Sequence, residues 1–176
     1  MNGQIASPTL YIFSGLPGSG KSTLAQGLAE AVGAAYLRID TIEQAIRDLC
    51  SFKVEGEGYR LAYRVAADNL RLGISVVSDS CNPIELTRDE WNQVAIDSGA
   101  AYANIEIVCS DLAEHQRRVE TRKPSVVGLA LPTWEAVVNR EYEQWKQEPV
   151  RVDTAGRSIQ DCLQELLEQL ELQAPD

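Results

Sequence analysis

Short apolar runs alternate along the chain with longer segments whose apolar residues recur every three or four positions. The short runs are rich in branched and aromatic residues, as expected of buried strands. They lie at residues 9–13, 35–39, 74–78, 104–109 and 150–153. The longer segments have the periodicity of amphipathic helices. They lie at residues 21–31, 41–50, 59–72, 84–98, 111–122, 133–147 and 159–170.

Strands and helices that alternate in this way are typical of an α/β fold, in which helices cover both faces of a parallel sheet. Glycines at 33, 73 and 99 end three of the predicted helices. Asp111 is followed three residues later by Glu114, which resembles a capping box at the start of another helix. Residues 123–132 contain two prolines and a glycine and predict a loop.

The length of 176 residues is that of one ordinary domain, so we expect residues 1–176 to form a single domain. The net charge of −10 argues against a broad nucleic-acid footprint and against binding to an anionic membrane. No apolar run approaches the length of a membrane helix. The sequence contains no signal for an oligomeric state.

The first eight residues contain neither the basic nor the apolar region of a signal peptide. The four cysteines are scattered, which predicts buried reduced thiols in a cytoplasmic protein. They are Cys50, Cys81, Cys109 and Cys162. His115, the single histidine, stands in a polar stretch and is expected on a solvent-exposed helix face.

The most informative segment is residues 15–22, which read GLPGSGKS and match the phosphate-loop motif between a strand and a helix. Glycines allow successive backbone amides to point toward one polyphosphate, and the following helix adds its positive end. Lys21 supplies a cation for the β- and γ-phosphates, and Ser22 supplies a hydroxyl for Mg²⁺. The expected nucleotide contacts are Gly15, Pro17, Gly18, Ser19, Gly20, Lys21, Ser22 and Thr23.

No guanine-reading segment of the N-K-x-D type is present, so an adenine nucleotide is expected. Its base is predicted to lie against residues 153–156, which include Gly156, at the end of the last strand. The cofactors expected from the motif are therefore ATP and Mg²⁺.

Two aspartates follow predicted strands at the edge of the sheet where open α/β proteins bind ligands. Asp79 resembles a Walker-B carboxylate that orients Mg²⁺ together with Ser22, and the alternative is a cap for the next helix. Asp40 is placed to accept the proton of an attacking hydroxyl and to hold that hydroxyl in line. The alternative for Asp40 is likewise a helix cap.

Three arginines precede the loop at 123–132 and are conspicuous in an acidic chain. Arg118 and Arg122 are four residues apart, so a continuous helix would place them on one face. Guanidinium groups on a lid at about residues 118–133 would stabilise the charge of a transferring phosphoryl group. The alternative is a basic helix face paired with Glu114 and Glu120.

These segments resemble those of the AAA-type small P-loop kinases, which include polynucleotide 5′-kinase domains and chloramphenicol phosphotransferase. Residues 39–45 are similar to the family segment that carries the catalytic aspartate, and residues 76–83 are similar to its S-D-T-N-x-N-P segment. The resemblance implies a P-loop three-layer sandwich with a five-stranded parallel sheet in the order 2-3-1-4-5 and a small lid.

Glu43 stands where polynucleotide kinases of this type carry an arginine for substrate phosphate, and Arg47 lies one turn further on. This departure and the acidic charge favour a small hydroxylated molecule as acceptor over a nucleic acid. We therefore predict an ATP-dependent phosphotransferase with Lys21, Asp40, Arg118 and Arg122 as catalytic residues. A polynucleotide 5′-kinase, a non-catalytic ATP-binding module and an ATPase remain as alternatives.

Overall fold

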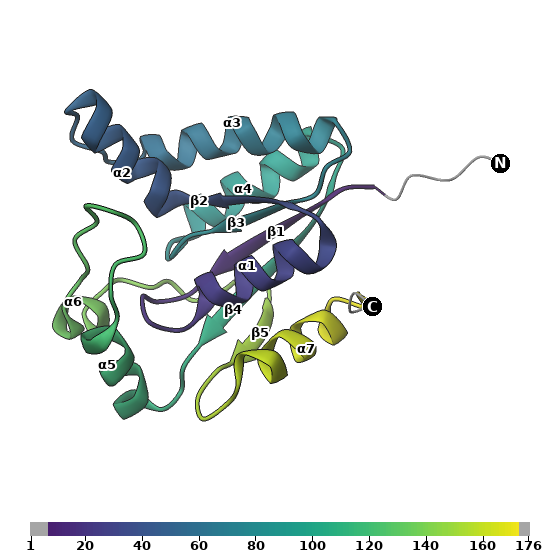
Figure 1. Cartoon of the computed structure of the whole chain (residues 1–176). Helices are drawn as coiled ribbons and strands as arrows, with labels where there is room; N and C mark the ends of the chain where they lie inside the picture. Colours follow the sequence, from purple (N-terminus) through teal and green to yellow (C-terminus); the bar gives the residue numbers. More distant parts are fainter. Residues whose placement is uncertain (1–6, 173–176) are drawn as a thin grey trace.

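A computed structural model describes residues 7–172, and at its centre lies a sheet of five parallel strands (Figure 1). The strand order is β2-β3-β1-β4-β5, which confirms the predicted order. The strands are β1 (Thr9–Ser14), β2 (Ala35–Arg38), β3 (Val76–Asp79), β4 (Ala101–Val108) and β5 (Val150–Asp153).

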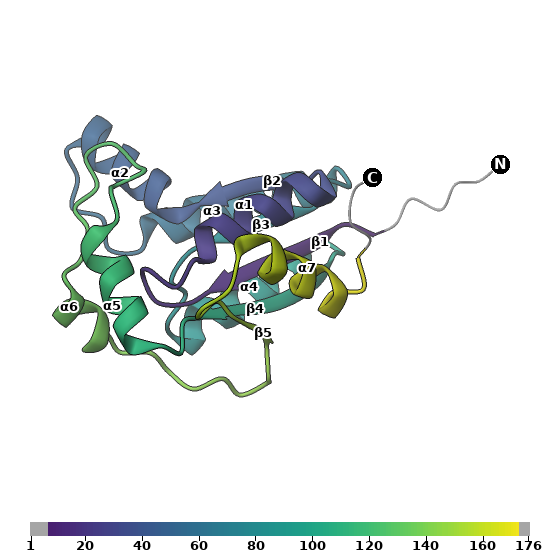
Figure 2. The same ribbon diagram turned by 60° about the horizontal axis from the view of Figure 1, so that its bottom comes forward.

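Helices cover both faces of the sheet, so the predicted three-layer sandwich is also confirmed (Figure 2). The α1 and α7 helices pack on one face, whereas α3 and α4 pack on the other. The helices are α1 (Lys21–Val32), α2 (Ile39–Cys50), α3 (Glu57–Arg71), α4 (Glu85–Asp97), α5 (Leu112–Thr121), α6 (Trp134–Val138) and α7 (Ile159–Gln169).

The central strand β1 explains why its run is apolar without interruption. Successive side chains of a strand point to opposite faces, so Leu10 and Ile12 pack against α3 and α4 while Tyr11 and Phe13 pack against α1 and α7. All four residues are buried. Such a strand requires apolar side chains on both faces, and its carboxyl end leads directly into the phosphate loop.

The helix predicted at residues 133–147 is wrong beyond Val138, because tertiary contacts replace helical hydrogen bonds in the segment that follows. The buried Arg88 of α4 donates to the carbonyl oxygen of Glu143 at 2.9 Å, and its guanidinium lies 3.9 Å from the Trp145 ring centroid. The carboxylate of Glu143 accepts from the backbone amide of Glu85 at 2.6 Å. The segment therefore wraps around α4 instead of forming its own helix.

The prediction of buried thiols holds for two cysteines and is wrong for the others. Cys109 and Cys162 are buried, whereas Cys50 is exposed and Cys81 is half-buried. No helix within residues 7–172 has the length and apolar character needed to cross a membrane. Residues 1–6, which belong to the segment searched for a signal peptide, lie outside the described residues.

Candidate active site

The phosphate loop lies between β1 and α1, and its glycines adopt backbone conformations that other residues disfavour. Gly15, Gly18 and Gly20 all have positive φ angles. A Cβ atom on Gly15 would lie 2.3 Å from the carbonyl oxygen of Ile107, and one on Gly18 would lie 2.6 Å from Val119 Cγ2. Only glycine allows the loop to pack this closely against its neighbours.

His115 packs against this loop, so its predicted position on an exposed helix face is wrong. The side chain is only 5% exposed, and its Nε2 donates to the carbonyl oxygen of Pro17 at 2.9 Å. Its ring meets the ring of Trp134 edge to face. The polar neighbours of His115 in the sequence face solvent, but the helix turns this one residue toward the loop.

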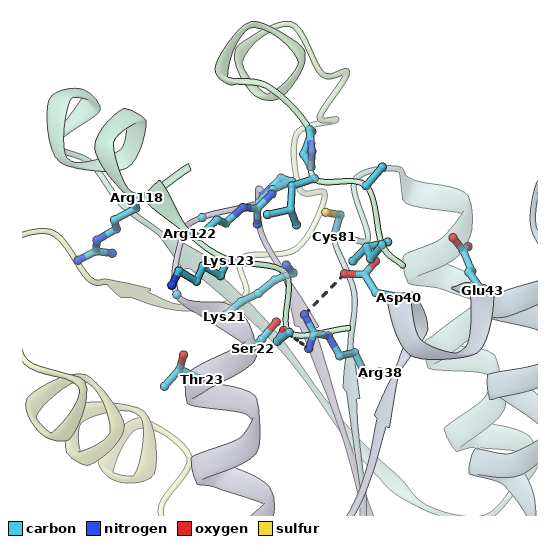
Figure 3. A pocket seen from close by; sticks show the side chains of 18 of the residues that line it. Lys21, Ser22, Thr23, Arg38, Asp40, Glu43, Cys81, Arg118, Arg122 and Lys123 are labelled. Carbon is cyan, nitrogen blue, oxygen red and sulfur yellow. Dashed lines mark hydrogen bonds and ion pairs between the residues drawn. The ribbon is translucent and has the colours of Figure 1, made fainter. Parts of the chain in front are cut away.

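Beside the loop is a cavity of 420 Å³, and nine of the predicted site residues line it. These are Lys21, Ser22, Thr23, Asp40, Arg118 and Arg122, together with Pro17, Gly18 and Gly20 of the loop. Figure 3 shows Lys21 and Arg122 pointing into the same space beside the Cys81 sulfur, whereas Arg118 points away from them. The ends of β2 and β3 and the loop after α5 complete the wall.

Lys21 is a buried cation whose charge is maintained by its surroundings. Its side chain is 8% exposed. Burial disfavours the charged ammonium, but electrostatic interactions with neighbouring acidic groups, first Cys81 and then Asp79, outweigh burial and raise the pKa of Lys21. Lys21 therefore carries a full positive charge at the floor of the cavity, where a polyphosphate would bind.

Asp79 ends β3 and has the features expected of a carboxylate that orients a metal ion. It is 2% exposed, and its Oδ2 accepts a hydrogen bond from the Tyr36 hydroxyl at 2.7 Å. Its Oδ1 is buried without a hydrogen-bond partner among the described residues. Asp79 does not cap the next helix, because the N-cap of α4 is Ile84.

These residues fit a magnesium ion that is held mainly through nucleotide phosphates. Within residues 7–172, no group of three histidine, cysteine or acidic side chains is arranged to bind a metal ion. Mg²⁺ in nucleotide sites is commonly bound by one or two protein oxygens, together with phosphate oxygens and water. Ser22 and the free oxygen of Asp79 match that requirement.

Asp40 lies in the first turn of α2 and not at the end of the second strand, because the strand ends at Arg38 and the helix begins at Ile39. Its side chain is 49% exposed, and the nearest cation is Arg38 Nη2 at 3.9 Å. It makes no capping hydrogen bond. The carboxylate is therefore free to receive a hydrogen bond from a molecule in the cavity.

Arg118 and Arg122 do not share a helix face, because α5 ends at Thr121 and Arg122 adopts an extended conformation. Arg118 Nη1 donates to Thr154 Oγ1 at 2.8 Å, and its Nη2 donates to Glu114 Oε1 at 2.6 Å. The predicted alternative pairing with Glu114 is thus present for Arg118. The hydrogen bond from Arg118 to Thr154 joins α5 to the loop that follows β5.

Arg122 turns into the cavity instead. Its Nε is buried without a hydrogen-bond partner among the described residues. Burial, together with the nearby cations Arg38 and Arg140, lowers the pKa of Arg122, although Cys81 and Asp40 oppose this effect. A half-buried guanidinium that is crowded by like charges and has a buried, unpartnered Nε is placed to receive an anionic group.

Gly156 lies in the turn after β5, where the adenine was expected. Its φ is positive, and its amide donates to Glu114 Oε2 at 2.8 Å. The adjacent Thr154 is buried, and its hydroxyl donates to the carbonyl oxygen of Ser19 at 2.8 Å. This turn is therefore connected to the phosphate loop. Such a connection would fix the distance between a base bound at the turn and phosphates bound at the loop.

Sequence reasoning missed several residues that line the cavity, among them Arg38, Cys81, Lys123 and Arg140. Arg38 Nη1 donates to the Ser125 hydroxyl at 2.8 Å and so joins the second strand to the loop after α5. The available signal for Arg38 was its position at the end of a strand that leads to Asp40. Arg140 had no such signal, because its segment was predicted to be helical.

The AAA domain family model AAA_33 matches residues 10–148, which includes every wall of the cavity named above. The structure is similar to the APS kinase CysC of Mycobacterium tuberculosis, solved in complex with AMPPNP and APS, with a TM-score of 0.71 and 20% identity. That alignment covers 94% of this chain and 98% of the other. A gluconokinase from Sinorhizobium meliloti aligns with a TM-score of 0.67 and 20% identity over 94% and 93% of the chains.

These structural similarities show that the fold is that of small P-loop kinases. Among curated proteins, adenylate kinase 1 of Synechocystis is 41% identical over 64 residues, which are 36% of this chain and 34% of that protein. Matches to uncharacterized mycobacterial proteins span 45 residues and only 9% of their length. The sequence matches are therefore local, whereas the family and fold matches extend over most of the chain.

Proposed function

Because the chain belongs to the AAA_33 family of AAA domains and has the fold of small P-loop kinases, we propose that it transfers the γ-phosphoryl group of ATP to a hydroxyl of a small molecule. One observation carries this proposal. The half-exposed carboxylate of Asp40 lines the same 420 Å³ cavity as Lys21 and Ser22, with no capping role to occupy it.

The nucleotide is held by the loop amides and by Lys21, with its base against the turn that contains Gly156. The buried positive charge of Lys21 attracts the β- and γ-phosphates. When Mg²⁺ is bound, it neutralises phosphate charge and makes the terminal phosphorus easier to attack. Ser22 and Asp79 are the protein groups that would hold this ion.

Asp40 then acts on the acceptor. Its carboxylate accepts a hydrogen bond from the acceptor hydroxyl and holds the oxygen in line with the terminal phosphorus. As the new oxygen–phosphorus bond forms, the bond between the γ-phosphorus and the β–γ bridging oxygen breaks, ADP leaves, and the hydroxyl proton passes to Asp40. The guanidinium of Arg122 offsets the negative charge on the moving phosphoryl group.

The loop at about residues 118–133 is proposed as the lid of a single kinase domain. It runs between α5 and α6 (Figure 1), its residues 129–132 line the cavity, and its Ser125 is bonded to Arg38 of β2. Removing water from the cavity would favour transfer to the acceptor over hydrolysis of ATP. Closure would also bring Arg122 against the phosphates.

Release of ADP should be measured with ATP and Mg²⁺ against a panel of sugars, nucleosides, amino alcohols and hydroxylated antibiotics. The proposal expects turnover that depends on one class of acceptor. It also expects Lys21→Ala to abolish nucleotide binding, and Asp40→Asn to lower turnover by about 10²- to 10⁴-fold while ATP still binds. Asp68→Asn is the matched control, because Asp68 is an exposed α3 carboxylate outside the cavity.

Phosphate release without any acceptor would indicate an ATPase, and ATP binding without turnover would indicate a binding module. Stimulation by 5′-hydroxyl oligonucleotides alone would indicate a polynucleotide kinase. Acceptor-dependent turnover that survives Asp40→Asn would remove the role proposed for Asp40.

A further inference from the structure

A second cavity of 410 Å³ lies next to the nucleotide cavity. The two cavities have Asp40, Glu43, Cys81 and Arg140 in common, so Asp40 faces both of them. The remaining wall comes from the start of α2, the loop before α3, α3 itself, the segment between β3 and α4, and the first turns of α4. A hydroxyl compound whose reactive oxygen lies at Asp40 therefore has room for the rest of its structure in the second cavity.

The carboxylates of this second cavity each have a partner among the described residues. Four acidic side chains line it, and each has a cation or a hydroxyl donor within 4 Å. The pairs are Asp40 with Arg38 at 3.9 Å, Glu43 with Arg47 at 3.0 Å, Glu55 with Lys53 at 3.0 Å, and Glu90 with the Tyr63 hydroxyl at 2.9 Å. Three of the four carboxylates therefore have a cation of the protein nearby, and the fourth, Glu90, is hydrogen-bonded to a hydroxyl.

Two arginines of the same cavity, in contrast to these carboxylates, have no partner among the described residues. Arg60 of α3 and Arg140, in the segment after α6, line the cavity, and neither guanidinium has a hydrogen bond or ion pair within residues 7–172. Arg140 also stands close enough to Arg122 to lower the pKa of Arg122, after the larger effect of burial. Arg60 and Arg140 are both exposed, and because no carboxylate of the described residues lies within ion-pair distance of either guanidinium, each is available to an anionic group.

The rest of the wall is uncharged. Tyr59 and Ile84 contribute ring and aliphatic surface, and the buried hydroxyl of Ser80 has no hydrogen-bond partner in the described part of the chain. Among the charged groups of this cavity, the two arginines are those whose charge has no partner in the described residues, which favours a negatively charged ligand.

We propose that the acceptor alcohol carries an anionic group, such as a carboxylate, phosphate or sulfate, that Arg140 and Arg60 bind while Asp40 holds its hydroxyl. This inference rests on the proposed function and narrows its substrate class. It also reconciles a net charge of −10 with a negatively charged substrate, because seven basic side chains line the nucleotide cavity that adjoins the second one.

The test compares alcohols that differ only in charge, in two independent assays. The panel contains glycerol, glycerate and glycerol 3-phosphate, with erythritol and erythronate as a second set and ethanolamine and serinol as cationic members. Calorimetry with the protein saturated by Mg-AMPPNP measures binding to the second cavity alone, because the analogue already occupies the phosphate loop. ADP release with ATP measures transfer.

The variants Arg140→Gln and Arg60→Gln should each weaken binding of the anionic members by about tenfold to a hundredfold and leave neutral members unchanged. Arg64→Gln is the matched control, because Arg64 is exposed on the same helix one turn from Arg60 and lines neither cavity. Circular dichroism and thermal unfolding would show that each variant is folded.

Binding that prefers neutral or amine-bearing members, or that is unaffected by both substitutions, would overturn the inference. If turnover then still depended on an acceptor, the proposed function would stand without it. Anion binding that is lost in the variants, but with no transfer to any acceptor, would support the anion site and contradict the phosphotransferase proposal. The two assays thus separate the two failures.

Discussion

The nucleotide side and the acceptor side of the crevice differ in how their polar groups are satisfied. On the nucleotide side, Arg118 is bonded to Glu114 and Thr154, and His115 is bonded to Pro17. On the acceptor side, the guanidinium groups of Arg60 and Arg140 have no partner within the described residues. The arginine and the histidine that support the first side are bonded without a ligand, whereas the arginines of the second side lack the negative charge that a substrate would supply.

This difference indicates at which step each ligand would gain its binding energy. A preorganised site binds its ligand without ordering cost, so the nucleotide should bind to the free protein. The acceptor side gains its counter-charge only when the substrate arrives, and lid closure over that substrate is then favourable. Substitutions on the two sides should therefore differ in which kinetic constant they change.

Replacing Arg122 by alanine should have the largest effect, because this side chain is placed between the two sides and faces the phosphoryl group. We expect kcat to fall by about 10³-fold while KM for ATP stays nearly constant. Steady-state kinetics measure both constants. Arg117→Ala is the control, since Arg117 is 72% exposed on α5 and should leave kcat unchanged. An equal loss in both variants would contradict the role of Arg122.

The acceptor side also depends on the segment after α6, which Arg88 holds in place. Arg88→Ala would leave the carbonyl oxygens of Asn82 and Glu143 without their donor. We expect the free energy of unfolding to fall by about 3 kcal/mol, as measured by urea denaturation. Arg71→Ala, at an exposed position of α3, should change it by less than about 0.5 kcal/mol. Similar urea midpoints for both variants would show that Arg88 is not an anchor.

Arg118→Ala tests the nucleotide side, and its effect should fall on binding. The turn that contains Thr154 and Gly156 would lose its attachment to α5, so KM for ATP should rise by about thirtyfold with a smaller change in kcat. Calorimetry with Mg-AMPPNP would give the matching loss of affinity. A selective loss of kcat would instead place Arg118 at the transferring phosphoryl group.

The smallest effect is expected from Tyr36→Phe, which removes one donor to Asp79 Oδ2. The carboxylate would then be oriented less firmly, and the Mg²⁺ concentration that gives half-maximal ADP release should rise by about tenfold. Nucleotide binding measured without Mg²⁺ should be unchanged. If the magnesium requirement is the same in Tyr36→Phe and in the wild type, the Tyr36 hydroxyl does not position Asp79.

The sheet and the phosphate loop could be predicted because their signals are local. The continuous apolar run of β1 and the glycine spacing of residues 15–20 each depend on the backbone of a few adjacent residues. The resemblance to small P-loop kinases then supplied the strand order that the structure confirms. The position of Asp40 beside the cavity was also within reach, although its helix begins two residues earlier than expected.

The rest depends on contacts between residues far apart in the sequence. His115 stands among polar neighbours, yet it packs beneath a loop almost one hundred residues away. Arg140 stands in a segment with helical periodicity, but hydrogen bonds with Arg88 and Glu85 hold that segment in another conformation. No pattern within a short window carries this information, because the competing interactions are tertiary.

His115 gives the protein a built-in spectroscopic reporter. The chain contains a single histidine, and its imidazole contacts the backbone of the phosphate loop. If one ring carbon of histidine is labelled with an isotope, His115 alone gives the side-chain NMR signal. That signal needs no separate assignment, because the chain contains no other histidine. Titration with nucleotides could be followed through that resonance in the unmodified wild-type chain, with no engineered probe.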